Sequence, residues 1–277
     1  MSGLRLGDKG APVKAFQLGL LAAGMILPRW GTDGSYGPET DTASATFARR
    51  EGLAKARGES SAEIVARALA YTVPASDWLV PAEDRELSPH RYKSTHPRVK
   101  PLDLVVLHYT ASPWQVPEKE EARVRRWGRG ETRKSSTHFV ILRTGKVLQL
   151  MPLSDRAWHV VDEYEHEGQP INYWSVGIDF GNVGFLTAQP DGTYRDYYGG
   201  RYLGPPPFID ENGRPWEPIT AVQVDAARAL LRTLGGLFPA LREPGRLIGH
   251  SDVQPTRSDP GPACPRWLLE NALMGDA

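Results

Sequence analysis

The sequence predicts an α/β protein, in which a mixed central β-sheet flanked by helices follows a small three-helix domain. From residue 101 onward, short apolar runs alternate with helical stretches, which is typical of a sheet covered by helices. Residues 1–72 show helical spacing instead. Residues 73–100 hold four prolines, which disfavour continuous helix and stiffen a linker. We therefore place a helical module at 1–72, a proline-rich linker at 73–100 and a sheet domain at 101–277.

The helical module is predicted from apolar spacing and from its turns. Val13, Phe16 and Leu20 lie on one face of a first helix. Pro38 suits the first turn of a second helix, where a missing N–H has little effect. The segment Ser-Ser-Ala-Glu at 60–63 offers a capping box for a third helix.

Apolar runs in the sheet domain predict its strands. Residues 104–107 form a buried run that ends at His108. Residues 175–180 form a second run, which places Asp179 near the exit of a strand. Residues 138–150 predict a β-hairpin around a glycine turn.

Two further segments complete the domain. Residues 220–237 predict a long helix, with Thr220 and Gln223 as its cap. Residues 185–218 are rich in Gly, Pro and Tyr and have no clear period. They predict a long loop or insertion, and loops of that length tend to line or cover a site.

Composition excludes several classes of protein. The formal net charge is zero and the pI is about 7.1, so no overall field favours nucleic acid or an anionic membrane. The single cysteine excludes an intrachain disulfide. The longest apolar stretch, at 18–27, is too short to span a bilayer, and the first residues lack the apolar core of a secretory signal. We expect synthesis in the cytoplasm without a signal peptide, and a monomer.

Three residues in the sheet domain are candidate metal ligands. His108 ends one apolar run, His250 follows Leu-Ile-Gly, and Asp259 begins a stiff Asp-Pro-Gly-Pro turn. If the two strands are neighbours, the histidines lie close enough to share one ion. Two histidines and a carboxylate leave the fourth position of tetrahedral zinc open for water, as in catalytic sites. Zinc lowers the pKa of that water to about 7.

Five motifs occur in a fixed order along the sheet domain. They are Leu107-His-Tyr-Thr-Ala-Ser112, Ser136-Thr-His-Phe-Val-Ile141, Ala157-Trp-His159, Asn172-Tyr-Trp-Ser-Val-Gly-Ile-Asp179, and Gly249-His-Ser-Asp252 with Asp259-Pro-Gly-Pro262. Together they resemble the zinc-dependent N-acetylmuramoyl-L-alanine amidases of the type 2 family, relatives of peptidoglycan-recognition proteins. The resemblance implies a zinc ion at the base of a groove. It also implies hydrolysis of the amide that joins the lactyl group of N-acetylmuramic acid to L-alanine.

The resemblance also implies roles at the metal. It makes His108, His250 and Asp259 the zinc ligands. Part of the family uses a cysteine as the third ligand, so Cys264 remains an alternative to Asp259. Asp179 occupies a position where many members carry a glutamate that acts as general base; the alternative is a solvated carboxylate at a strand end.

Further roles concern the substrate. Arg257 matches a site where relatives often carry lysine, and a cation there can stabilise the oxyanion of the tetrahedral intermediate. His159 matches a groove residue that contacts substrate or polarises the scissile carbonyl. Thr137 takes a substrate-binding position at which some branches carry tyrosine. His138 is expected to be a core or supporting histidine.

The helical module has a resemblance of its own. Its matching segments are Leu6-Gly-Asp-Lys-Gly10, Phe16-Gln17 and Asp33-Gly-Ser-Tyr-Gly37, together with several apolar positions. These resemble the peptidoglycan-binding module of many cell-wall hydrolases. The alternative is a generic three-helix domain without a ligand.

Together, these features predict a peptidoglycan hydrolase whose partner is the muramyl peptide and whose cofactor is Zn2+. With no export signal expected, the simplest biology is a phage or prophage endolysin that reaches the bacterial cell wall after release. The alternatives are a secreted effector amidase, or a recognition protein that binds peptidoglycan without cutting it.

Overall fold

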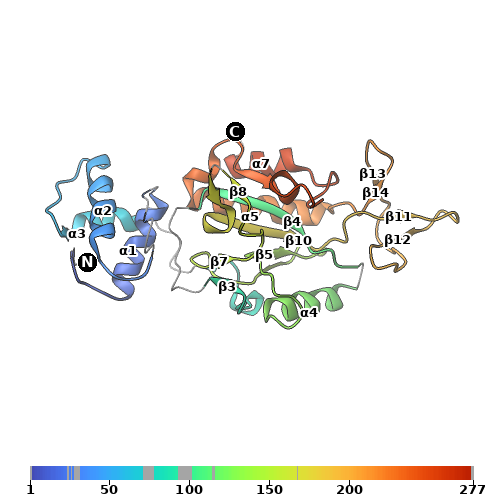
Figure 1. The fold of residues 1–277 in the computed structure, drawn as a ribbon, viewed down its shortest axis with the longest axis horizontal. Coiled ribbons are helices and arrows are strands. Elements are labelled where there is room, and N and C mark those ends of the chain that lie inside the picture. Colours follow the sequence, from blue (N-terminus) through green and yellow to red (C-terminus); the bar gives the residue numbers. More distant parts are fainter. Residues whose placement is uncertain are drawn as a thin grey trace.

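A five-stranded mixed sheet lies at the centre of the part that follows residue 101 (Figure 1). The structure, a computed structural model, describes residues 2–23, 25, 27, 32–70, 78–92, 102–113, 116–166 and 168–275. The strand order is β15 (Leu247–Gly249), β4 (Leu104–Tyr109), β10 (Ser175–Phe180), β5 (Phe139–Ile141) and β6 (Val147–Gln149). The first four run parallel, and β6 is antiparallel to β5. The predicted fold class is confirmed.

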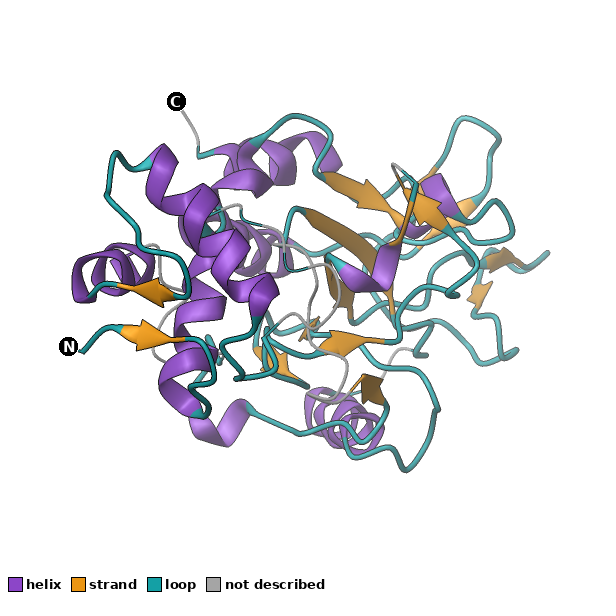
Figure 2. Ribbon diagram, turned by 60° about the vertical axis from the view of Figure 1, so that its left-hand side comes forward, coloured by secondary structure: helices purple, strands orange, loops and turns teal. Residues whose placement is uncertain are grey.

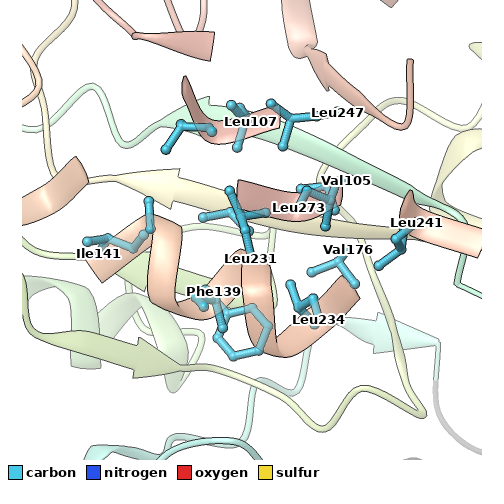
Figure 3. Packing of buried hydrophobic residues seen from close by; sticks show 14 of the residues in the cluster. Val105, Leu107, Phe139, Ile141, Val176, Leu231, Leu234, Leu241, Leu247 and Leu273 are labelled. Atoms are coloured by element: carbon cyan, nitrogen blue, oxygen red, sulfur yellow. The ribbon is translucent and has the colours of Figure 1, made fainter. Parts of the chain in front are cut away.

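Helices α5 (Ala221–Leu237) and α7 (Arg266–Met274) cover one face of this sheet. Leu231 and Leu234 of α5 point toward the side chains of β4 and β10 (Figure 3). Complete burial of one such leucine side chain contributes about 1.5–3 kcal/mol. α5 begins with the predicted capping box, in which the Thr220 side chain accepts from the Gln223 N–H.

The other face of the sheet is covered by different elements. Val124 and Trp127 of α4 (Pro117–Gly128) pack against Val140 and Leu148 of the β5–β6 hairpin. Beside this cluster, the inward side chains of β4 give way to polar residues toward the end of the strand, where His108 lies. Because side chains alternate between faces along a strand, Val105 and Leu107 face α5, whereas Leu104, Val106 and His108 lie on the opposite face, where an apolar cluster ends next to His108.

Residues 78–92 form a strap along the edge of the sheet. The Glu86 and Ser88 N–H groups donate to the Gln149 and Leu150 carbonyls at 2.9 Å each. The strap contains η1 (Ala82–Asp84) and ends in β3 (Arg91–Tyr92), which pairs with β7 (Arg156–Ala157). This part of the expected linker at 73–100 is therefore structured. The rest of it, 73–77 and 93–100, lies outside the described residues.

The helical module has a hydrophobic core of its own, all of it within residues 4–69. Its elements are β1 (Leu4–Arg5), α1 (Ala11–Ala22), α2 (Pro38–Arg50), β2 (Glu59–Ser60) and α3 (Ala62–Ala70) (Figure 2). The predicted capping box of the third helix is wrong. Ser60 lies in β2 and bonds Tyr36 and Ser44, while the Ser61 hydroxyl accepts from the Ile64 N–H at 3.3 Å.

The segment expected to be a long loop contains two small hairpins that project from one end of the sheet domain (Figure 1). They are β11 (Thr187–Ala188) with β12 (Tyr194–Arg195), and β13 (Phe208–Ile209) with β14 (Pro215–Trp216). Two-residue strands are too short to show an alternating pattern, so no sequence pattern predicts them.

Short elements complete the chain. They are β8 (Glu165–His166), β9 (Gln169–Pro170), η2 (Ile171–Tyr173), η3 (Pro239–Arg242) and α6 (His250–Val253). Within the described ranges, none of the helices combines the length and apolar character needed to cross a bilayer.

Candidate active site

Three neighbouring strands bring the predicted site residues together. β4 lies between β15 and β10, as the hypothesis of a shared ion required. Asp179 of β10 is the Cα partner of His108 on β4. His250 follows directly after β15 as the first residue of α6. His108 thus lies one residue before the end of its strand, close to the predicted place, and near the same edge of the sheet as His250.

The side chains of His108, His250 and Asp259 converge on one point. The two Nδ1 atoms are 3.1 Å apart, and they lie 2.9 and 3.0 Å from the same Asp259 oxygen, Oδ2. All three residues are buried. Four-coordinate zinc holds nitrogen and oxygen ligands about 2.0–2.2 Å from the ion, so ligand atoms about 3 Å apart suit it. This donor set can hold a metal ion.

The second ring nitrogen of His250 is held by a residue that the sequence had not identified. Nε2 donates to the Gln254 amide oxygen at 2.9 Å, and Gln254 is buried. A histidine that donates from Nε2 keeps the lone pair on Nδ1, the atom that faces the cluster. Gln254 lies four residues after His250, a spacing that places both on one face of a helical turn.

A chain of hydrogen bonds does the same for His108. The Ser175 hydroxyl donates to the Ile171 carbonyl at 2.7 Å, so it accepts from His159 Nε2, 2.9 Å away. Nδ1 of a neutral His159 is then an acceptor, and the Nε2–H of His108 donates a hydrogen bond to it across 3.0 Å. The chain leaves the lone pair of His108 on Nδ1, toward His250 and Asp259. His159 therefore supports a candidate ligand in addition to lining the pocket.

Gly177 makes room for this chain. It lies on β10 between Ser175 and Asp179, on the face that also carries His108. A Cβ atom at this position would lie 2.9 Å from Cγ of His159 and 2.7 Å from Oγ1 of Thr137. Only glycine lets the imidazole of His159 cross the strand and reach His108.

Replacing His159 with alanine is expected to weaken metal binding. Loss of an outer hydrogen-bond partner of a metal ligand lowers affinity about 10- to 100-fold. Gly177→Ala keeps the imidazole but obstructs its place, so the same direction is expected. The dissociation constant for Zn2+, measured by competition with a chromogenic chelator, checks both variants.

A matched control is His166→Ala, because His166 stacks on Trp174 away from the cluster. Its affinity for Zn2+ should equal that of the wild type. Wild-type affinity in His159→Ala would contradict the supporting role of the hydrogen-bond chain.

Asp179 is buried at the wall of the pocket that contains the cluster. Burial raises the pKa of its carboxyl above the usual value, and the charge of His108 acts in the opposite direction. A carboxylate in this environment is a better proton acceptor than an exposed one.

Thr137 is fully buried over Gly177, and the pocket wall beside it is formed by Ser135 and Ser136. Thr137 is therefore not among the residues that line the pocket, but its side chain contacts the carboxyl of Asp179, which does line it.

The pocket has a volume of about 470 Å³. Arg257 is exposed and lines it, as expected for a group that acts on substrate. A second cation, Arg133, lines the same pocket, donates to the Thr110 carbonyl at 2.8 Å and lies over the Trp127 ring at 5.4 Å. Arg133 follows the helix α4 in a polar segment, so no sequence pattern pointed to it.

Comparison with known proteins agrees with this geometry. The sequence profile described as N-acetylmuramoyl-L-alanine amidase matches residues 98–262. The chain belongs to the N-acetylmuramoyl-L-alanine amidase family. In this amidase-family chain the matched region contains every residue of the cluster, and the predicted family is confirmed for the sheet domain.

Individual relatives show how far the similarity extends. The chain is 28% identical over 140 residues to the 1,6-anhydro-N-acetylmuramyl-L-alanine amidase AmpD of Enterobacter cloacae. The aligned region covers 50% of this chain and 57% of that protein. It thus spans little more than half the length of this curated relative. A solved AmpD derivative gives a TM-score of 0.48 at 22% identity, covering 73% of this chain and 99% of that chain. AmpDh3 from Pseudomonas aeruginosa, in complex with anhydromuramic pentapeptide, gives 0.44 at 20%, covering 73% and 66%.

Cys264 is not part of the cluster in this amidase-family chain. The described metal-ligating groups that converge are two histidines and Asp259, whereas Cys264 belongs to the apolar core beneath α5 and α7. Burial raises the pKa of the Cys264 thiol to about 12. Because a thiolate is the form that binds metal, the alternative third ligand is disfavoured.

Proposed function

We propose that this protein is a zinc-dependent N-acetylmuramoyl-L-alanine amidase that hydrolyses the amide between the lactyl group of N-acetylmuramic acid and L-alanine. One observation carries the proposal. Two imidazole nitrogens and a carboxylate oxygen converge at a pocket, within the region that matches the amidase family. A chain that had kept only recognition of peptidoglycan would have no need of a complete donor set.

His108, His250 and Asp259 would hold the ion. Bound zinc supplies Lewis acidity, which polarises the scissile carbonyl and makes water a nucleophile near neutral pH. Gln254 and His159 keep both histidines in the form that presents Nδ1.

Asp179 is the group that takes the proton of the attacking water and later delivers it to the amine of L-alanine. Asp179 suits this role by its place at the pocket wall, directly beside His108 on the neighbouring strand. Arg257, from the exposed side of the pocket, supplies positive charge to the oxyanion. Arginine keeps its charge at any working pH.

The helical module is proposed to bind peptidoglycan and so raise the local concentration of substrate at an insoluble polymer. In cells, the protein is proposed to act as a phage or prophage endolysin that reaches the wall after release from the cytoplasm. The names of the relatives leave two substrate forms for this chain, intact wall and 1,6-anhydro-muramyl peptides.

Purified sacculi test the proposed function. Zinc-loaded protein should release stem peptides with free L-alanine amino termini, detected by mass spectrometry. Protein treated with a chelator should release none until Zn2+ is restored. Release of reducing sugars instead, or full activity after metal removal, would contradict the amidase mechanism.

A further inference from the structure

A tight turn at residues 196–200, directly after β12 in the insertion, presents two tyrosines. The buried Asp196 carboxylate accepts from the Tyr198 and Gly200 N–H groups at 2.9 Å each. Gly199 has φ of +80°, which closes the turn. Tyr197 and Tyr198 are nevertheless 69% and 55% exposed. A turn held this firmly around two exposed aromatic rings indicates a binding role, since loops that carry function are positioned by rigid scaffolds.

Tyr197 belongs to the wall of the active-site pocket, together with Phe185. The two rings meet edge to face with centroids 6.1 Å apart. Phe185 in turn contacts Trp216 of β14 at 6.0 Å. Trp216 lies against Gly261, where a Cβ atom would come within 2.9 Å of its ring. A continuous aromatic series therefore connects the exposed Tyr197 with the turn that carries Asp259.

The remaining walls of the pocket differ in charge from this aromatic series. Arg133 and Arg257 line the pocket itself. A neighbouring pocket of about 480 Å³ shares Trp127 and Arg133 with it and continues along α4 past Lys119, Arg123 and Arg126. The stem peptide carries carboxylates, which suit these cations. The sugar that bears the lactyl group needs no cation to bind, because its ring is uncharged.

We propose that Tyr197, supported by Phe185, binds the sugar ring of the substrate, so that the insertion is a saccharide subsite next to the metal cluster. The assignment rests on the proposed amidase function. The C–H groups on one face of a pyranose ring carry partial positive charge, and they suit the negative face of a tyrosine ring. Pockets of this kind combine aromatic walls with a few polar groups that fix orientation.

Two soluble substrates with the same scissile amide test the proposal, with the full-length, zinc-loaded protein. One is an N-acetylmuramoyl tripeptide, and the other is the corresponding D-lactoyl tripeptide, which lacks the sugar. The readout is the ratio of kcat/KM for the first substrate to kcat/KM for the second. Tyr197→Ala should lower this ratio about tenfold, because the stacking contact exists only with the sugar. Tyr197→Phe keeps the ring and should keep the ratio.

Phe208→Ala is the matched control. Phe208 is an exposed aromatic residue of the same insertion but lines a different pocket, so its ratio should equal that of the wild type. An equal loss of kcat/KM on both substrates in Tyr197→Ala would overturn the saccharide assignment and place the ring beside the lactyl group or the peptide. Wild-type protein that cleaves neither substrate would instead overturn the proposed function.

Discussion

Replacing Asp259 with alanine is expected to lower amidase activity by a factor on the order of a thousand, because the bound metal is lost. Oδ2 of Asp259 is the atom nearest to both imidazole Nδ1 atoms, at 2.9 and 3.0 Å. It is also the anionic member of the donor set. Burial acts to raise the pKa of its carboxyl, but the adjacent imidazoles of His108 and His250 outweigh burial and keep that pKa well below the usual range. Two neutral imidazoles alone make a poor site for a divalent cation.

Two measurements check this expectation. Competition with a chromogenic chelator gives the dissociation constant for Zn2+, and release of stem peptides from sacculi gives the activity. In Asp259→Ala, zinc binding and the release of stem peptides should both be lost. Unchanged zinc affinity would contradict its assignment as a ligand.

Replacing Asp179 with asparagine tests a buried carboxylate that is expected to act as a base and not as a metal ligand. Asp179 lies beside the cluster but is not among the three converging groups. Its replacement should leave zinc affinity within a few-fold of the wild type, whereas kcat falls about 10²- to 10⁴-fold, the usual contribution of a general base. If zinc affinity fell as far as in Asp259→Ala, Asp179 would be a ligand and not the base.

Replacing Arg143 with methionine is expected to destabilise the sheet domain by about 3–5 kcal/mol. The guanidinium lies between two buried carboxylates. Its Nε and Nη2 donate to Glu217 at 2.6 and 2.7 Å, and its Nη1 donates to Glu120 at 2.5 Å. Both glutamates are only 2% exposed. Methionine fills a similar volume but leaves two buried negative charges without a cation.

The loss should depend on pH. Burial raises the pKa of Glu217 even with Arg143 present, and removal of the cation raises it further. A carboxyl whose pKa is higher in the folded state binds more protons there than in the unfolded chain, so stability falls as pH rises above the ordinary value of 4.5. The variant should therefore be less impaired at pH 5 than at pH 7.

Urea denaturation followed by tryptophan fluorescence measures both effects. Arg129→Met is the matched control, because Arg129 pairs with Glu131 on the surface and its side chain is 46% exposed. Exposed pairs contribute about 0–1 kcal/mol. A loss in Arg143→Met no larger than in the control would show that the buried cluster does not stabilise the fold.

His108 and His250 could be selected as candidate ligands from the sequence because each ends or follows an apolar run, and Asp259 because it begins a stiff turn; the structure brings the three side chains together. His108 and His250 come from adjacent parallel strands, and the hydrophobic pattern of those strands is visible in one dimension. Gln254 could have been found by its spacing from His250. The contact between His159 and His108 joins residues 51 positions apart and depends on the space left by the missing side chain of Gly177. No local sequence pattern predicts a contact of this kind.

The insertion marks another limit of sequence reasoning. Its hairpins consist of two-residue strands, and their positions depend on contacts such as Arg143 with Glu217, separated by 74 residues. Composition correctly indicated an inserted segment beside the site. The aromatic series from Tyr197 to Trp216 becomes visible only when the hairpins are placed.

The strap at residues 78–92 covers one edge of the sheet that holds the candidate site. β6 is an edge strand, and an uncovered edge offers free N–H and C=O groups to any passing chain. The strap occupies two of the carbonyls at this edge, those of Gln149 and Leu150, through the N–H groups of Glu86 and Ser88. Similarity to the amidase family starts only at residue 98, so a fragment cut there would keep the whole candidate metal site while exposing the sheet edge to self-association. We therefore expect the strap, which lies outside the part of the chain that defines the family, to limit pairing of this sheet edge with other chains.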